Sequence, residues 1–367
     1  MADYKIDSHK LWWHSERVEE WLNNTDCGPI YLEIGLTNIC NHDCTFCGFD
    51  YAQGTNTLPS KVILENLKPM KECGVKSICY SGAGEPCLHK DFPEIISQTN
   101  AAGIDAAFST NAALFDKDKA EKVLPYASWV RFSVDAATPE THAKIHRPKR
   151  ASPESDFEIV IKNISNAVEI KQKNTYPVTL GAQFILLEEN KHELLPFAEM
   201  CRKIGVDLLQ IKPYSRHPPS IKKLNVDYNN CQLLEDNVLK YATPDFKVVF
   251  RSSRMQRISS QRNYSHCLAL PFWAMINERG DVMPCDIYYD QPSHSYGNIK
   301  ESNFYDIWHS ERRRQIMDSI FEKGTSGCKE GCRMDAINID LWKLKKRELS
   351  LKDILQKGSP PANVNFI

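Results

Sequence analysis

The sequence lacks the features that mark membrane proteins, secreted proteins and strongly charged binding proteins. No apolar run among its 367 residues approaches the roughly 20 residues that span a bilayer. The first residues, MADYKIDSHKLWWHSERVEEW, are polar and charged and show no signal-peptide pattern. The 46 Lys and Arg residues nearly balance the 47 Asp and Glu residues, so the formal net charge is −1. We therefore expect a cytoplasmic protein that binds neither a membrane nor nucleic acid.

Cysteine, by contrast, is abundant. The chain has 13 cysteines, an odd number, and no secretion signal. Cytosolic thiols stay reduced, so these residues do not indicate a disulfide framework. Clustered cysteines in such a chain are more often metal ligands or redox groups. Their grouping along the sequence is therefore the most informative pattern.

Between residues 30 and 213, short apolar runs alternate with amphipathic stretches. The apolar runs are rich in β-branched residues, as in strands buried on both faces. Six strand–helix units in series predict an α/β fold with a parallel sheet, either a barrel or part of one, and we expect a partial (β/α)6 barrel of parallel strands. In such a barrel the chemistry lies at the C-terminal ends of the strands. The predicted strands are 30–36, 76–80, 104–110, 129–135, 178–186 and 207–212.

The chain divides into four predicted regions. Residues 1–29 form a helical N-terminal extension, 30–254 the barrel, 255–340 a small cysteine-rich domain and 341–367 a tail. The second boundary follows from a change in character, since residues 252–265 are polar and basic, as in a linker or loop. Short strands, turns and further cysteines follow. The Pro-Pro-Ala-Asn stretch predicts that the tail is extended and mobile.

The first cysteine group directly follows the first predicted strand. Cys40, Cys44 and Cys47 stand in CNHDCTFC with the spacing C-x3-C-x2-C. Three thiolates in one loop can bind three irons of a 4Fe–4S cluster and leave the fourth iron open to a substrate or cofactor. A zinc site with His42 as its fourth ligand is the alternative. The position of the triplet after strand one favours the iron–sulfur interpretation.

With this triplet and several later stretches, the chain resembles the radical S-adenosylmethionine superfamily. The resemblance implies that the open iron chelates the amino and carboxylate groups of S-adenosyl-L-methionine. One electron from the reduced cluster then cleaves the sulfonium, and the resulting 5′-deoxyadenosyl radical abstracts hydrogen from the substrate. The resemblance also implies an external reductant, such as flavodoxin or ferredoxin.

The same resemblance assigns the residues that contact S-adenosylmethionine. Phe46 takes an aromatic position near the adenine, with core packing as its alternative role. The stretch from Ser81 to Pro86 resembles the GGEP motif that holds the methionine ammonium, although Ala83 replaces its first glycine. Polar residues at later strand ends match further contacts with the cofactor. The predicted cofactor-binding residues are Phe46, Gly84, Glu85, Asn111, Ser133, Asp135, Arg147 and Gln183.

Two of these polar positions, Arg147 and Gln183, keep a structural alternative, and so do Lys212 and Cys87. Pro148 replaces the glycine that relatives usually carry after the arginine, and an exposed basic loop explains Arg147 equally well. Gln183 and Lys212 could owe their place to ordinary polarity at strand ends. Cys87 follows the Gly-Glu-Pro turn and could donate a hydrogen atom to a substrate radical. Its alternative is a buried structural thiol.

The second cysteine group lies in the C-terminal region. Four thiolates complete a 4Fe–4S cluster in which the protein ligates every iron, and a zinc site is the alternative. The region resembles the auxiliary-cluster extension called SPASM. It resembles more closely the shortened twitch form, as in 2-deoxy-scyllo-inosamine dehydrogenase, although its last pair is C-x3-C. We therefore expect two 4Fe–4S clusters, the auxiliary one held by Cys267, Cys285, Cys328 and Cys332.

The predicted function is hydrogen abstraction from a small polar molecule: a carbohydrate, a cyclitol or a nucleotide-linked sugar. One auxiliary cluster suits net oxidation of an alcohol carbon, because it can accept the second electron. A radical epimerase and a peptide- or protein-modifying maturase are the alternatives. Only about 30 residues precede the barrel, fewer than a fused peptide-recognition domain needs. An electron carrier or zinc protein is disfavoured by the Gly-Glu-Pro turn, since neither needs an ammonium site.

Overall fold

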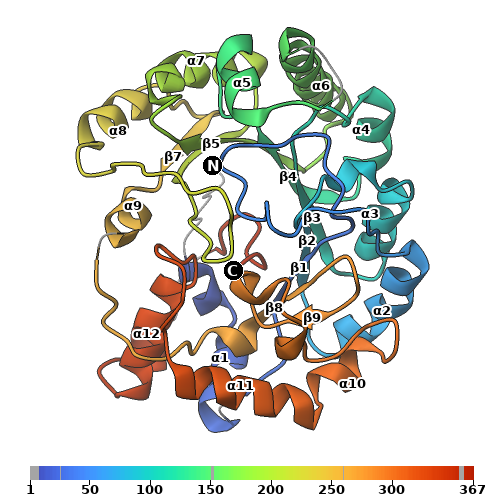
Figure 1. Cartoon of the computed structure of the whole chain (residues 1–367), viewed down its shortest axis with the longest axis vertical. Coiled ribbons are helices and arrows are strands. Elements are labelled where there is room, and N and C mark those ends of the chain that lie inside the picture. Colours follow the sequence, from blue (N-terminus) through green and yellow to red (C-terminus); the bar gives the residue numbers. More distant parts are fainter. Residues whose placement is uncertain (1–7, 25, 150–152, 259, 355–358) are drawn as a thin grey trace.

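The structure is a computed structural model that describes residues 8–24, 26–149, 153–258, 260–354 and 359–367. One sheet forms its centre, and helices lie around the outside of that sheet (Figure 1). Among the described residues, no helix is both long and apolar enough to cross a membrane. The architecture is the predicted α/β fold with a parallel sheet at its core.

The sheet contains nine strands in the order β7-β6-β5-β4-β3-β2-β1-β8-β9. All neighbouring pairs are parallel except β8 and β9. The run from β1 to β6 is sequential and linked by helices, as right-handed crossovers require. The strands are β1 (Tyr31–Ile34), β2 (Ser77–Tyr80), β3 (Asp105–Thr110), β4 (Ala127–Ser133), β5 (Thr179–Leu186), β6 (Leu208–Pro213), β7 (Lys247–Phe250), β8 (Trp273–Ile276) and β9 (Val282–Met283).

Local sequence sets the limits of the helices. Asp116 and Thr138 accept backbone N–H groups at the starts of α4 and α5, as good N-caps do. Gly205 ends α7 with φ 89°. The helices are α1 (Ser15–Asn24), α2 (Ser60–Glu72), α3 (Phe92–Ala101), α4 (Lys117–Val123), α5 (Pro139–His146), α6 (Pro153–Asn174), α7 (Leu194–Ile204), α8 (Gln232–Leu239), α9 (Ser252–Ile258), α10 (Phe304–Trp308), α11 (Glu311–Lys323), α12 (Asp335–Lys345) and α13 (Leu351–Ile354), with a 3-10 helix η1 (Ser8–Trp13) before them.

The main core lies between the sheet and the surrounding helices. Phe92 of α3 lies with its ring centroid 4.9 Å from that of Phe108 on β3, and Phe115 lies 5.3 Å from Phe108. All three rings are fully buried. Burial of each such side chain contributes roughly 1.5–3 kcal/mol. Because side chains alternate along a strand, the other face of these strands points into the barrel, where polar residues gather.

The structure corrects the prediction that residues 252–265 form a linker or loop. Residues 252–258 form α9, and its buried residues are Arg254 and Met255. A buried arginine interrupts the pattern of apolar residues by which an amphipathic helix is normally recognised in a sequence. Beyond this helix, β8 pairs in parallel with β1, so the cysteine-rich region continues the central sheet.

The C-terminal tail is pinned across the N-terminal ends of the strands. Asn363 donates from Nδ2 to Thr179 Oγ1 (3.2 Å), and Asn365 donates from Nδ2 to Asp105 Oδ2 (2.7 Å). Phe366 packs against Tyr31 and Trp129, with ring centroids 6.0 and 5.3 Å away. The C-terminus accordingly lies near the middle of the barrel in Figure 1. The prediction of a mobile tail is wrong for residues 359–367.

Candidate active site and cluster sites

The first cysteine group lies in the loop that follows β1, and α5 holds that loop in place. The backbone N–H of Asp43 donates to the carbonyl oxygens of His146 and Arg147, both at 3.1 Å. Thr45 N–H donates to the carbonyl of Ile145 (2.8 Å). Nδ1 of His146 lies 3.3 Å from Sγ of Cys44. The end of α5 therefore fixes the segment that carries the cysteines.

The chemistry of these three cysteines fits a metal cluster. Burial raises the pKa of Cys40 to about 12, and the carboxylate of Glu85 adds to the effect. Burial also raises the pKa of Cys44 and Cys47, and the thiols of Cys47 and Cys40 raise that of Cys44 further. Buried thiolates so close together need a positive partner. The irons of a 4Fe–4S cluster supply such a charge, so these residues could hold one.

The Gly-Glu-Pro turn packs directly on the loop that leads to Cys40. A Cβ at Gly84 would lie 2.4 Å from the carbonyl oxygens of Thr37 and Ile39, so this position requires glycine. Glu85 N–H donates to the carbonyl of Ile39 (2.9 Å). The structure thus brings the turn and the first cysteine group together, as the sequence predicted.

Glu85 has a structural role that the sequence did not reveal. Its carboxylate is 3% exposed and accepts three hydrogen bonds from its surroundings. The donors are Cys87 N–H (3.0 Å), Thr110 Oγ1 (2.7 Å) and Asn111 N–H (2.8 Å). Glu85 therefore joins the ends of β2 and β3. Asn111 in turn donates from Nδ2 to Asn41 Oδ1 (2.7 Å) in the cysteine loop.

The predicted residues of β4 and β5 form one row inside the barrel. Ser133 pairs in register with Gln183, whose Nε2 lies 3.4 Å from Ser133 Oγ. Oε1 of Gln183 is buried without a hydrogen-bond partner in the described part of the chain. Asp135 follows in the left-handed region, with φ 60°. Burial raises its pKa to about 7. One of its oxygens accepts Ile185 N–H (2.5 Å), and the other lies 3.3 Å from His146 Nε2.

The other predicted residues differ in their surroundings. Phe46 is 8% exposed and packs among Ile145, Ile185, Leu187 and Tyr214. Arg147 is exposed and ends α5 in the left-handed region, so the structure favours its alternative as a basic loop residue. Cys87 is buried in the main core with Sγ 3.6 Å from Thr110 Oγ1, a position that favours a structural thiol.

The four cysteines of the second group also converge. Burial raises the pKa of Cys267 to about 12 and that of Cys328 to about 11, and Cys332 raises both further. The pKa of Cys285 is raised well above its usual value by burial, with Cys267 and Cys332 contributing. Asn338 Nδ2 donates to Sγ of Cys267 (3.5 Å), and such donors favour a thiolate. These residues could hold the auxiliary cluster.

His217 connects the two cysteine groups, and the sequence did not single it out. Its ring lies 5.0 Å from that of Phe49, just beyond Cys47. Its Nε2 lies 3.3 Å from Nζ of Lys329, and Lys329 pairs with Asp286, the residue after Cys285. A lone histidine in a loop gives no sequence signal for such a contact.

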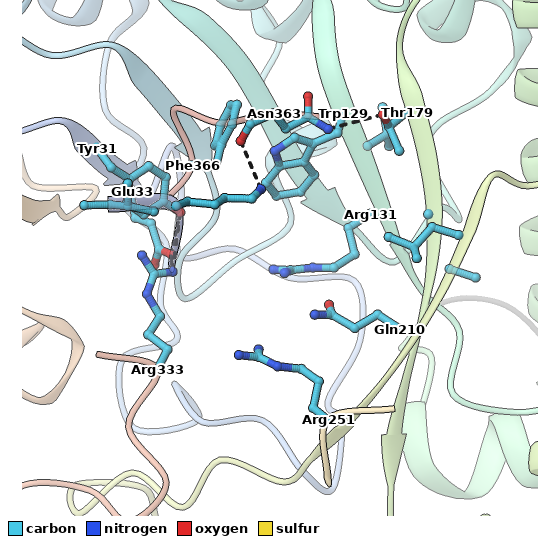
Figure 2. Close-up of a pocket in the computed structure, with 16 residues that line it drawn as sticks. Tyr31, Glu33, Trp129, Arg131, Thr179, Gln210, Arg251, Arg333, Asn363 and Phe366 are labelled. Carbon is cyan, nitrogen blue, oxygen red and sulfur yellow. Dashed lines mark hydrogen bonds and ion pairs between the residues drawn. The ribbon is translucent and has the colours of Figure 1, made fainter. Parts of the chain in front are cut away.

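A cavity of about 150 Å³ lies inside the barrel. Its wall includes residues from four barrel strands, the pinned tail and Arg333, which directly follows Cys332. Figure 2 shows Arg131, Gln210 and Arg251 pointing into this space from one side, with Glu33 and Arg333 opposite. Arg333 pairs with Glu33. The segment that carries Cys332 therefore contributes one residue, Arg333, to the wall of a pocket within the barrel.

Two family models match this chain. Residues 34–201 match the Radical SAM superfamily, and residues 267–333 match SPASM, an iron–sulfur cluster-binding domain. The match to SPASM leaves the closer resemblance to the twitch form as a prediction.

Among curated proteins, the chain is 32% identical over 196 residues to a probable GTP 3′,8-cyclase of Saccharolobus islandicus. This alignment covers 53% of the chain and 59% of that relative. A probable GTP 3′,8-cyclase of Methanococcus maripaludis is 28% identical over 229 residues, which covers 61% of the chain and 70% of that protein. The chain thus spans 59% of the length of the Saccharolobus relative, less than two thirds.

Among solved structures, Streptococcus suis SuiB bound to S-adenosylmethionine aligns with a TM-score of 0.65 and 18% identity. The alignment covers 82% of this chain and 71% of SuiB. At this identity the likeness concerns the fold. A Radical SAM domain binds S-adenosylmethionine and a 4Fe–4S cluster, and a SPASM domain binds auxiliary iron–sulfur clusters. The chain therefore carries a Radical SAM domain followed by a SPASM domain.

Proposed function

We propose that this enzyme oxidises an alcohol carbon of a small polar molecule: a carbohydrate, a cyclitol or a nucleotide-linked sugar. The observation that carries the proposal is the pocket whose wall joins the barrel strands to Arg333, the neighbour of Cys332. Ser133 and Gln183, which lie two residues beyond Arg131 and Gly181 on the same strands, continue from this pocket toward the C-terminal ends of the strands. The small volume of about 150 Å³ suits a small molecule or one end of a larger one.

In this proposal the two cysteine groups hold different centres. Cys40, Cys44 and Cys47 hold the cluster that binds S-adenosylmethionine, and the second group holds the auxiliary cluster. When bound, these centres supply a 5′-deoxyadenosyl radical that accepts a hydrogen atom and an acceptor for one electron. Oxidation of the alcohol to a carbonyl then releases one hydrogen atom, one electron and one proton, so the reaction balances.

The residues of this chain have three tasks in that reaction. The strand residues of the pocket orient the substrate through polar side chains such as Gln210. Phe366 and its neighbours in the tail close the barrel below the pocket and limit the entry of water. Arg333 and Glu33 form the wall on the side of the auxiliary site. Exclusion of water protects a reactive radical from side reactions.

The second candidate class is peptide modification, because SuiB has been solved with its precursor peptide SuiA. At 18% identity that structure supports a shared fold only. The curated relatives are named for a cyclase that acts on GTP, a small molecule. Their names favour a small-molecule substrate over a peptide. Epimerisation by Cys87 is disfavoured by the burial of that thiol in the core.

The proposal can be tested with the reconstituted enzyme, S-adenosylmethionine and a reductant in deuterated water. The substrates offered are panels of cyclitols, free sugars, sugar phosphates, nucleotide sugars and peptides. We expect a cyclitol or sugar compound to yield a product lighter by two hydrogen atoms, with no solvent deuterium on the reacting carbon. A deuterium at that carbon in a product of otherwise unchanged formula would indicate epimerisation. Turnover of peptides alone would contradict the proposal.

A further inference from the structure

The pocket inside the barrel carries an excess of positive charge. Its described wall includes four basic residues and one acidic residue, Glu33. Glu33 is already paired with Arg333, which also lies over the rings of Tyr31 and Trp273, with 4.7 Å to each centroid. Arg333 and Glu33 therefore offset each other. The other basic residues of the wall are Lys10 and Arg251, which have interactions of their own, and Arg131.

Arg131 stands out among these groups. Its guanidinium lies 5.4 Å from the ring centroid of Trp129. Within the described residues it makes no hydrogen bond or ion pair, and its Nε is buried without a partner. Ser109, its register neighbour on β3, also has a buried Oγ without a hydrogen-bond partner. Buried polar groups are costly unless a ligand or water satisfies them.

Gln210 faces the same space from β6. Its side chain is 5% exposed and forms no hydrogen bond in the described part of the chain. Gly181 lies between Arg131 and Leu208 in the register of the sheet, and its missing side chain leaves room beside the guanidinium. Figure 2 shows Arg131, Gln210 and Arg251 pointing into the same space from one side. Donors that make no hydrogen bond in the described part of the chain thus face that space from β4 and from β6.

A further buried cation, Arg254, lies behind this wall and is 6% exposed. Burial lowers the pKa of Lys212 well below its usual value, and the charges of Arg131 and Arg254 lower it further, against the opposing effect of Asp135. This poorly solvated interior therefore disfavours the charged form of Lys212. A bound anion would offset the cost of burying Arg131 beside these groups.

We propose that the substrate carries a phosphate or pyrophosphate group, which binds in this pocket to Arg131 and Gln210 beside Arg251. The inference rests on the proposed function, because it concerns the substrate of the same pocket. A planar carboxylate is satisfied by a single guanidinium, whereas a phosphate presents oxygens in several directions. The donors of Arg131 and Gln210 approach from two different strands, β4 and β6, and can therefore contact different oxygens of a phosphate.

The pocket is distinct from the predicted cofactor positions. Among the described residues that line it, none belongs to the predicted S-adenosylmethionine site. Ser133 and Gln183 lie two residues further along β4 and β5 than Arg131 and Gly181, toward the C-terminal ends of the strands. A substrate whose phosphate contacts Arg131 would extend its other end toward that row and toward the first cysteine group. This orientation brings the uncharged part of the substrate to the reacting region.

The test measures binding of pyrophosphate to the reconstituted enzyme with S-adenosylmethionine present. The probes are sodium pyrophosphate, inorganic phosphate and sodium acetate. Their binding is measured by calorimetry and by the change in the melting temperature of the protein. The variant is Arg131→Met, which removes the charge and keeps a stem over Trp129. The matched control is Arg202→Met, because Arg202 is exposed and lies over the ring of Tyr241 at 5.8 Å.

We expect pyrophosphate to bind wild type and the control equally and to raise both melting temperatures. Arg131→Met should weaken this binding by about tenfold to a hundredfold, the usual effect of losing a charged hydrogen-bonding partner. Its melting temperature without pyrophosphate should equal or exceed that of wild type, since one of several crowded cations has been removed. Arg131→Lys should bind with intermediate affinity, because a lysine keeps the charge and loses the fork.

Three results would overturn the inference. These are no binding to wild type, equal binding to Arg131→Met, and acetate binding as tight as that of pyrophosphate. The last result would assign a carboxylate to the pocket. None of these measurements needs turnover, so failure of the oxidation reaction and failure of the phosphate site are distinguishable.

Discussion

At the scale of single residues, the site depends on side chains that hold other parts of the site in place. Glu85 accepts hydrogen bonds from the turn after β2 and from the end of β3. His146 lies between Cys44 and Asp135. Each of these residues is buried and polar, and each touches a predicted ligand of a cofactor. Their loss should therefore affect cofactor binding and stability together.

Replacement of Glu85 by alanine tests this double role. The change leaves Thr110 Oγ1 and the N–H groups of Cys87 and Asn111 without an acceptor, which should lower stability by about 1–3 kcal/mol. It should also weaken S-adenosylmethionine binding, measured by calorimetry on the reconstituted enzyme. Glu94→Ala, an exposed change on α3, is the control. Unchanged cofactor affinity in a folded Glu85→Ala protein would remove the assignment of Glu85 as a cofactor-binding residue.

At the scale of elements, α5 and the C-terminal tail position the site from opposite ends. Glu193, just before α7, holds the start of α5 through hydrogen bonds from Ala137 N–H (2.6 Å) and from the hydroxyls of Thr138 (2.5 Å) and Thr141 (2.6 Å). The far end of the same helix holds the first cysteine loop. The tail closes the opposite end of the barrel.

The anchor of α5 should show a distinct pH dependence. Burial alone would raise the pKa of Glu193, but the hydrogen bonds from Thr138, Thr141 and Ala137 hold it below 4.5. The folded state therefore gains stability from this carboxylate above pH 4.5 and loses it as the pH falls through the lowered pKa. Glu193→Gln should lower the unfolding free energy by about 1–3 kcal/mol at pH 7.

Denaturant unfolding of wild type and Glu193→Gln across this pH range checks the prediction. The difference between them should shrink as the solution is acidified below pH 4.5. Glu199, whose side chain is 43% exposed and whose pKa is lowered by its hydrogen bond with Lys203, provides the control Glu199→Gln, which should change stability little. A constant difference between wild type and Glu193→Gln at all pH values would show that the carboxylate charge has no part in the anchor.

The packing of the C-terminal tail against the barrel leads to a separate prediction. Phe366 is 9% exposed and packs against Tyr31 and Trp129. Phe366→Ala should lower stability by about 3 kcal/mol and make the last residues more sensitive to a protease. Phe321→Ala, which alters a ring that is 39% exposed, should have a smaller effect. Equal melting temperatures for wild type and Phe366→Ala would contradict a structural role for the tail.

At the scale of the whole molecule, the sequence predicted local features better than distant contacts. The six barrel strands and the spacing of Cys40, Cys44 and Cys47 are local patterns, so they could be recognised directly. The pairing of β1 with β8 joins segments more than two hundred residues apart, and no local pattern reports it. The pairing of Arg333 with Glu33 was not predicted for the same reason, because these two residues also lie far apart in the sequence.

Buried charge also concealed part of the fold and of the site. The sequence did not predict α9, because Arg254 takes a buried position on this helix where an amphipathic pattern would have an apolar residue. No sequence pattern singled out Arg131, although its guanidinium faces the interior pocket. Local rules of sequence patterning most often fail at functional sites, and the ligand proposed for the pocket would give Arg131 such a role.

The central claim is that this barrel holds two 4Fe–4S clusters, one for each cysteine group. The most direct test is the iron, sulfide and zinc content of the anaerobically reconstituted protein. We predict about eight irons per chain in wild type and about four after replacement of Cys40, Cys44 and Cys47 by alanine. A wild-type protein with about four irons and one zinc per chain would contradict the auxiliary cluster.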